Sequence, residues 1–197
     1  MAETVEQYID RLTSYTADKD PLRMQRDALK KLAALLRGKT KQQLARRPAP
    51  GKWSAGEIYA HLADTETVVA YRLRQILATN GVAIQAYDQD LWADTFKYAR
   101  RDPKQSFATF RAVREGNLVL LKTVSRDLWN NYGMHEELGQ ESIVRLMKLT
   151  AGHDINHIRQ IEACLKAQPR QGQPAKSRSK RKPSKDVSKK SGAKKRR

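Results

Sequence analysis

"SAGEIYAHLADTETVVAYRLRQILATNG", residues 54–81, carries the pattern that decides the fold. Ser54 and Glu57 have the spacing of a capping box, in which each side chain bonds the backbone N–H of the other residue, and Asn80-Gly81 marks a helix end. Between these signals the apolar side chains recur every three or four positions, as they do in an α-helix with one buried face. The stretch therefore predicts one long amphipathic helix.

Three other long segments have the same kind of punctuation. One runs from Asp20 to Gly38 and another begins at Asp102, and each opens with Asp-Pro, an N-cap residue followed by proline at the first helical position. A third covers about 142–166, after a turn at Gly139, and a shorter amphipathic piece covers about 4–15. No stretch alternates with a period of two for long enough to predict a strand.

Four long helices with apolar stripes predict an all-α protein, and their connections favour a four-helix bundle. The loop over 81–101 is long enough for a crossover that includes a short helical turn. We expect one folded domain over residues 1–168.

The remaining segment, 169–197, is predicted to be a disordered tail. It holds thirteen Lys or Arg, one acid, one Val and two Ala, with no aromatic residue. Such a composition cannot bury enough apolar surface to offset the entropy of ordering the chain. Most of the net charge of +18 therefore belongs to the tail.

The composition favours a cytoplasmic protein. No apolar run approaches the ~18 residues that a membrane helix needs, and the start "MAETVEQYID" lacks the apolar core of a secretory signal. The one cysteine, Cys164, cannot form an internal disulfide, which fits a reducing compartment.

Two histidines lie four residues apart in "AGHDINHIRQIEA", residues 151–163. The apolar periodicity places His153 and His157 on the inward stripe of the last helix, and it places His61 on the inward stripe of the helix over 54–81. Either each ring is a core histidine satisfied by a hydrogen bond, or the three rings share one divalent cation. Spacing alone leaves both interpretations open.

The same residues resemble a known family. "PAPGKWSAGEIYAHLADTE", residues 48–66, together with "AGHDINHIRQIE", residues 151–162, resembles the DinB/YfiT-like superfamily of metalloenzymes. The resemblance covers most of residues 1–168 and implies a four-helix bundle that holds one divalent metal on His61, His153 and His157. It also implies metal-dependent activities, which include hydrolysis, thiol S-transfer with low-molecular-weight thiols and thiol-dependent isomerisation, and a homodimer.

Three neutral nitrogens would leave an open coordination position on the ion. Zinc is the first expectation, and nickel, iron and manganese stay open. Such an ion activates either a water or a thiol, so the substrate would be a small molecule, and a low-molecular-weight thiol in the second case. A metal held without catalysis, as a structural or sensing element, is the alternative.

Several polar residues are candidates for supporting roles around the metal. Gln160 follows His157 by one turn and Asp64 follows His61 by one turn, so each can orient a ligand or else lie on the helix surface. His135 is expected to be an exposed loop residue, with an acid–base role as the alternative. Glu66 and Asp154 are weaker candidates, and we expect Cys164 to pack in the core.

A different class of function depends on the tail. Its bases would bind a phosphate backbone through counterion release, without sequence specificity, because no aromatic residue is present to stack on bases. The alternatives are a solvated tail with no dedicated partner and adhesion to an anionic membrane surface.

Overall fold

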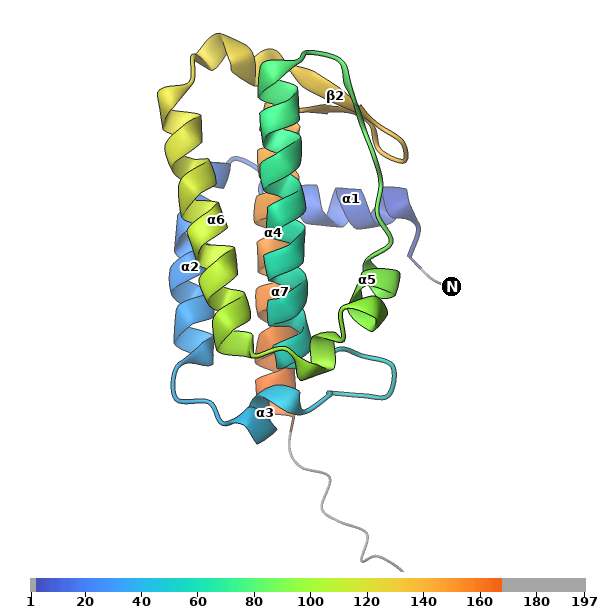
Figure 1. Ribbon diagram of the computed structural model, residues 1–197, viewed down its shortest axis with the longest axis vertical. Coiled ribbons are helices and arrows are strands. Elements are labelled where there is room, and N and C mark those ends of the chain that lie inside the picture. Colours follow the sequence, from blue (N-terminus) through green and yellow to red (C-terminus); the bar gives the residue numbers. More distant parts are fainter. Residues whose placement is uncertain (1–2, 168–197) are drawn as a thin grey trace, which may run out of the picture. The chain divides into compact units, whose positions relative to one another are not determined.

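The computed structural model describes residues 3–167, and four long helices dominate it. These are α2 (Pro21–Leu36), α4 (Ala55–Ala78), α6 (Pro103–Thr123) and α7 (Ile143–Lys166). They lie side by side along the long axis (Figure 1). The predicted four-helix bundle is confirmed.

Local sequence signals set the helix ends. The Ser54 side chain accepts the N–H of Glu57, and the Glu57 carboxylate accepts the N–H of Ser54, so the predicted capping box is present. Asp20 and Asp102 accept N–H groups at the starts of α2 and α6, each directly before a proline. The helix α4 ends at Ala78, two residues before the predicted Asn80.

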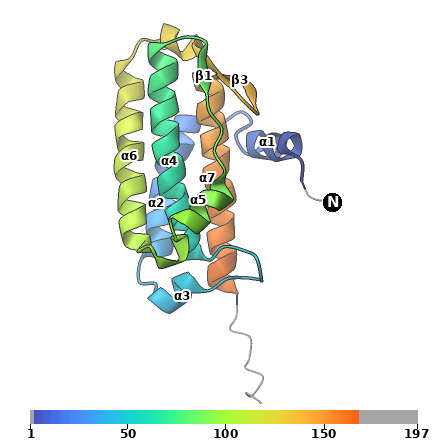
Figure 2. The same cartoon turned by 45° about the vertical axis from the view of Figure 1, so that its right-hand side comes forward.

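Shorter elements cover the sides and ends of the bundle. The helix α1 (Val5–Ser14) lies across α7 (Figure 2). The helix α3 (Lys41–Ala45) precedes α4, and η2 (Arg126–Asn130) follows α6. The crossover after α4 contains α5 (Gln89–Thr95) and η1 (Tyr98–Arg100). The short helical turn predicted for this loop is therefore present.

Three short strands, which the sequence pattern did not predict, close one end of the bundle. They are β1 (Val82–Ile84), β2 (Tyr132–His135) and β3 (Gly139–Ser142). In the order β1-β2-β3, the first pair is parallel and the second antiparallel. Strands of three or four residues are too short to show alternation, and β1 meets β2 only after the intervening helix α6 has returned the chain.

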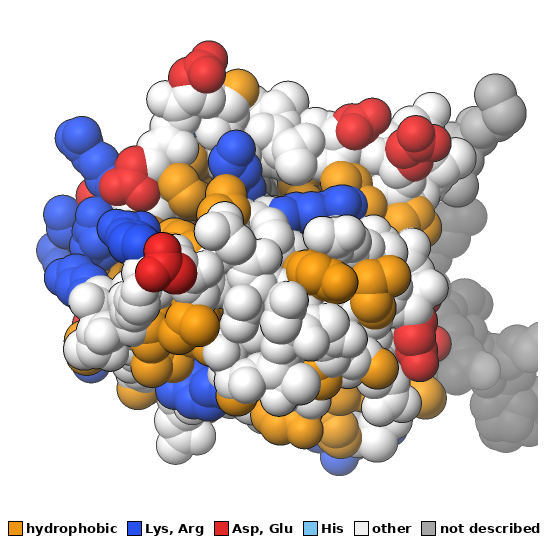
Figure 3. Space-filling view, turned by 90° about the horizontal axis from the view of Figure 1, so that it is seen from above, with side chains coloured by type: hydrophobic (Ala, Val, Ile, Leu, Met, Phe, Trp, Pro, Cys, Tyr) orange, Lys and Arg blue, Asp and Glu red, His pale blue; other side chains and the backbone are white. Residues whose placement is uncertain are grey.

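The side chains at the strand end of the bundle are mixed in character. Figure 3 looks onto this end and shows apolar side chains in several separate groups among polar and charged ones. Met134 on β2 is 48% exposed and Val144 at the start of α7 is 40% exposed.

The core consists of two apolar clusters with a polar layer between them. One cluster, which includes Leu32, Leu62 and Ile161, extends to α3. The other includes Leu73 and Leu118 and extends to β1. Between the two clusters, α2, α4, α6 and α7 each contribute buried polar side chains, namely Gln25, Glu66, Arg114, Asn117, Thr150 and Asp154.

Within residues 3–167, none of the helices combines the length and the apolar character that crossing a bilayer would require. The predicted tail over 169–197, and its predicted binding of nucleic acid, lie outside the described residues.

Candidate metal centre

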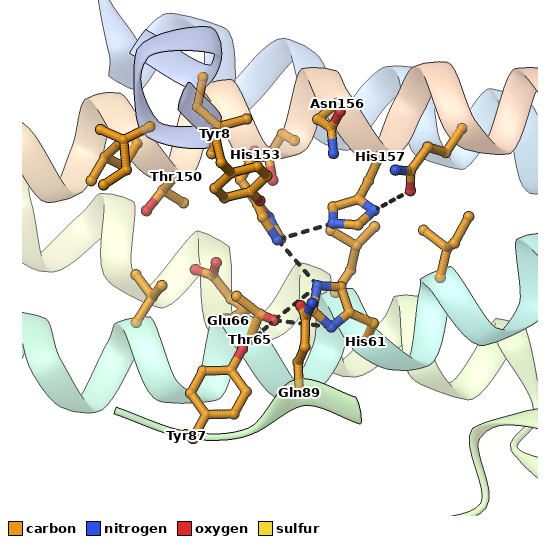
Figure 4. Close-up of a pocket in the computed structure, with 18 of the residues that line it drawn as sticks. Tyr8, His61, Thr65, Glu66, Tyr87, Gln89, Thr150, His153, Asn156 and His157 are labelled. Atoms are coloured by element: carbon orange, nitrogen blue, oxygen red, sulfur yellow. Dashed lines mark hydrogen bonds between the residues drawn. The ribbon is translucent and has the colours of Figure 1, made fainter. Parts of the chain in front are cut away.

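Three histidine side chains converge between α4 and α7, at the level of the polar layer. The Nε2 atom of His153 lies 3.1 Å from Nε2 of His61 and 3.0 Å from Nε2 of His157 (Figure 4). One ring nitrogen from each residue lies within 4.8 Å of those of the other two. His61 and His157 are buried, and His153 is partly buried. The structure therefore brings together the three histidines that the sequence had placed on two separate helices.

A neighbouring amide orients one of the rings. Nδ1 of His157 lies 2.9 Å from Oε1 of Gln160, and an amide oxygen only accepts hydrogen bonds, so Nδ1 carries the proton. The Nε2 lone pair of His157 then faces His153. A single Nε2–H cannot serve both close contacts of His153, so the three rings cannot satisfy all of their Nε2 atoms among themselves.

Burial keeps the three rings neutral. Desolvation lowers the pKa of His157 to about 4 and holds the pKa values of His61 and His153 well below their usual value. Repulsion between the rings acts in the same direction for His61 and His153. Neutral imidazoles are the form that ligates a metal.

A buried ionic network lies next to the histidines and connects α4, α6 and α7. The Arg114 guanidinium of α6 donates to Asp154 of α7 at 2.6 and 3.1 Å and to Glu66 of α4 at 2.7 Å. Asn117 donates to the other oxygen of Glu66 at 2.8 Å. All four side chains are at most 2% exposed. Glu66 lies on α4, which also carries His61, and Asp154 directly follows His153 on α7. The network therefore fixes both histidine-bearing helices against α6.

A glycine allows α1 to cover the site. A Cβ atom at Gly152 would lie 2.2 Å from the backbone oxygen of Leu12, so α1 and α7 approach too closely for any other residue. The contact lies directly before His153 in the sequence. It holds Tyr8 of α1 so that its side chain extends towards the histidines (Figure 4).

The histidines line a cavity of about 980 Å³, a volume suited to a small molecule. Tyr8, Thr65, Tyr87 and Asn156 also line it. The Thr65 hydroxyl lies 2.9 Å from that of Tyr87 and 3.4 Å from Nε2 of His61. Sequence reasoning missed these four residues. No sequence pattern placed α1 or the crossover against the histidines.

The remaining candidates have varied surroundings. Asp64 accepts a hydrogen bond from Arg101 at 2.7 Å, whereas Gln160 contacts His157 directly. Cys164 is 1% exposed and lies in the apolar core, as expected. His135 is 6% exposed and lies on β2, so the expectation of an exposed loop residue is wrong. The His135 side chain is buried because β2 is the central strand of the sheet that closes one end of the bundle.

These features define a class of protein, a four-helix bundle with a buried cluster of three neutral histidines that opens onto a cavity. The chain belongs to the DinB superfamily, whose family model matches residues 22–161.

Individual relatives agree with this assignment. The chain is 25% identical over 125 residues to an Oceanobacillus iheyensis protein named "Putative metal-dependent hydrolase", a match that covers 64% of this chain and 72% of that protein. It is similar in structure to YfiT from Bacillus subtilis, described as "a probable metal-dependent hydrolase with an unusual four-helix bundle topology". That match has a TM-score of 0.68 at 21% identity and covers 83% of this chain and 88% of YfiT.

A mycothiol-dependent maleylpyruvate isomerase is a more distant structural neighbour. It has a TM-score of 0.54 at 11% identity, over 75% of this chain and 60% of the isomerase. At this identity the similarity concerns the fold alone.

Proposed function

We propose that this protein is a metal-dependent enzyme, in which His61, His153 and His157 hold one divalent ion that activates a nucleophile towards a small-molecule substrate. The observation that carries the proposal is the convergence of three neutral Nε2 atoms at 3.0 and 3.1 Å on the wall of a cavity. The relative named as a metal-dependent hydrolase supports the same reaction class.

The donor set fits such an ion. Nitrogen ligands on a tetrahedral zinc, at about 2.0–2.1 Å from the metal, lie about 3.3 Å from one another. The two Nε2 separations from His153, 3.1 and 3.0 Å, are close to this value, and all three ligand nitrogens lie within 4.8 Å of one another. A cation would also satisfy the lone pairs that the rings cannot satisfy among themselves. Zinc is therefore our first expectation, with nickel, iron and manganese as alternatives.

A divalent ion on three neutral ligands supplies Lewis acidity and an open coordination position. The protein's own side chains would do the rest. Gln160 holds His157 in the tautomer that leaves Nε2 free to ligate, and the network around Arg114 keeps α4 and α7 at a fixed separation.

Tyr8 and the Thr65–Tyr87 pair would contact the substrate. Burial raises the pKa of Tyr8 to about 12, so its hydroxyl remains a neutral hydrogen-bond donor at any physiological pH. Thr65 and Tyr87 are linked by a 2.9 Å hydrogen bond in which either hydroxyl can donate. These groups can orient a polar substrate and donate to a negative charge that develops during the reaction.

Elemental analysis of protein prepared without a histidine tag tests the metal. We expect about one divalent ion per chain in the wild type and little in His157→Ala. The matched control is His135→Ala, which removes a buried histidine outside the cluster and should leave the metal content unchanged. Equal metal content in the wild type and His157→Ala would contradict the proposal.

The reaction itself has two candidates, which differ in the nucleophile. Hydrolysis uses water and thiol transfer uses a low-molecular-weight thiol. Turnover of activated esters without thiol would support the first, and turnover of an electrophile only with added thiol would support the second. If the metal-loaded protein turns over neither kind of substrate, the metal is structural or sensory and the enzymatic part of the proposal fails.

A further inference from the structure

The cavity extends well beyond the histidines, towards the strand end of the bundle. Arg72 of α4, His135 of β2 and Glu141 of β3 all line it. Arg72 follows His61 by eleven residues, so the two side chains leave α4 in nearly the same direction, about 16 Å apart along its axis. The Arg72 guanidinium contacts the crossover after α4, where it donates to the Gln85 carbonyl and lies over the ring of Tyr87, another residue of the cavity wall.

Glu141 is the most unusual member of this group. It is 2% exposed, and its Oε2 atom has no hydrogen-bond partner within residues 3–167. Burial raises its pKa above the usual value for a carboxyl group. Buried carboxyl oxygens are normally paired, so an unpaired one on a cavity wall indicates a missing partner that donates a hydrogen bond.

Arg72 and His135 present donors to the same end of the cavity. Among the described residues the Arg72 side chain makes one hydrogen bond, from Nη2 to the carbonyl of Gln85 at 2.7 Å, and no ion pair. Nδ1 of His135 accepts the backbone N–H groups of Glu137 and Leu138 at 3.1 and 3.3 Å. The neutral His135 ring therefore carries its proton on Nε2.

A polar path joins this group to the histidines. The Arg72 guanidinium lies over the Tyr87 ring, 5.9 Å from its centroid. The Tyr87 hydroxyl contacts Thr65, and Thr65 contacts His61. One elongated molecule can therefore reach both places along a continuous wall of the cavity.

We propose that Arg72, His135 and Glu141 form a subsite for an α-amino acid group at the far end of an elongated substrate or co-substrate. The carboxylate would accept from Arg72 and from Nε2–H of His135, and the ammonium group would donate to Glu141. The charges favour this zwitterion. A plain anion would face Glu141 and the nearby Glu137, whereas a plain cation would face Arg72.

This proposal rests on the proposed function, because the reactive end of the same molecule would lie at the three histidines. It adds the chemical class of the group at the other end. His61 and Arg72 are about 16 Å apart along α4, and both side chains extend into the cavity. A thiol whose α-amino acid group lies on the order of 10 Å from its sulfur is therefore long enough to reach both places. The binding step can be tested apart from the metal with a probe whose sulfur is blocked.

Isothermal titration calorimetry of the full chain with S-methylglutathione provides this test, since the γ-glutamyl end of that probe is an α-amino acid. We expect wild-type binding to weaken at least tenfold in Arg72→Met and in Glu141→Gln. Capping the amine, in N-acetyl-S-methylglutathione, should cost as much. The matched controls are Lys148→Met and Glu115→Gln, which remove the same charges from exposed positions outside the cavity.

Several outcomes would overturn the subsite. They are the absence of wild-type binding, equal affinity for the amine-capped probe, and unchanged affinity in both variants. Should Arg72→Met fail to fold, Arg72→Lys and Glu141→Gln test the same contacts. Metal content measured on the same samples separates the two proposals, since the subsite variants should retain the ion and His157→Ala should lose it.

Discussion

The buried guanidinium of Arg114 offers a quantitative test of how the site is supported. In Arg114→Met the packing volume is largely kept, but the carboxylates of Glu66 and Asp154 lose three hydrogen bonds of 2.6 to 3.1 Å. All three side chains are at most 2% exposed, so water does not replace those bonds. Removing one partner of a buried ion pair costs about 3–5 kcal/mol, and we expect a loss of that size in the free energy of unfolding.

Equilibrium unfolding in urea, followed by circular dichroism, measures this loss. With a slope of about 2 kcal/mol per molar urea, the midpoint should fall by about 1.5–2.5 M. The matched control is Arg111→Met, one turn earlier on α6, where the side chain is exposed and the change should stay within about 0.5 kcal/mol.

A variant without any of the three charges completes the test. Replacing Glu66 by Gln and Asp154 by Asn in the Arg114→Met background removes the uncompensated buried charges, so part of the loss should return. A midpoint shift below about 0.5 M in the single variant, or a shift no larger than that of Arg111→Met, would refute the argument. The polar layer would then be solvated or would tolerate unpaired carboxylates.

Two further predictions concern the metal-free protein and the packing of α1. The unfolded chain protonates each histidine near pH 6.5, whereas the folded chain protonates His157 only near pH 4, so stability is full above pH 6.5 and is lost as the pH falls towards 4. His157 alone should lower the free energy of unfolding by about 2 kcal/mol between pH 7.5 and pH 5, as urea titrations at the two pH values would measure, and pH-independent stability would contradict this. In Gly152→Ala the new Cβ would lie 2.2 Å from the Leu12 oxygen, so we expect a loss of about 1–3 kcal/mol in thermal or urea unfolding. Gly116→Ala in α6 meets no atom within 4 Å and should instead stabilise by about 0.5–1 kcal/mol, so the same sign for both variants would count against the close contact.

The helical fold could be read from local sequence because its determinants are local. Capping residues such as Ser54 and Asp20 satisfy backbone groups within one turn, and a 3.6-residue period marks a buried face wherever the partner helices lie. The same period identified His61, His153 and His157 as inward-facing. It could not predict the strands, because β1 pairs with a segment about fifty residues away and the hairpin of β2 and β3 is too short to show alternation.

The supporting residues of the site depended on tertiary packing. Tyr8 reaches the histidines because α1 crosses α7 at Gly152, and a glycine inside a helix gives no sign of which backbone will lie against it. Glu141 and His135 became buried when the strands closed the bundle end, although their local sequence is polar.

The sequence by itself determined the helices and the direction in which three histidines point, since both follow from periodicity along one helix. Only the tertiary structure decided that the three rings meet, that Arg114 lies between two carboxylates beneath them, and that the cavity continues towards Arg72 and Glu141. The physical reason is that helix propensity acts over a few residues, whereas a site depends on how distant segments pack and on which polar groups that packing removes from water.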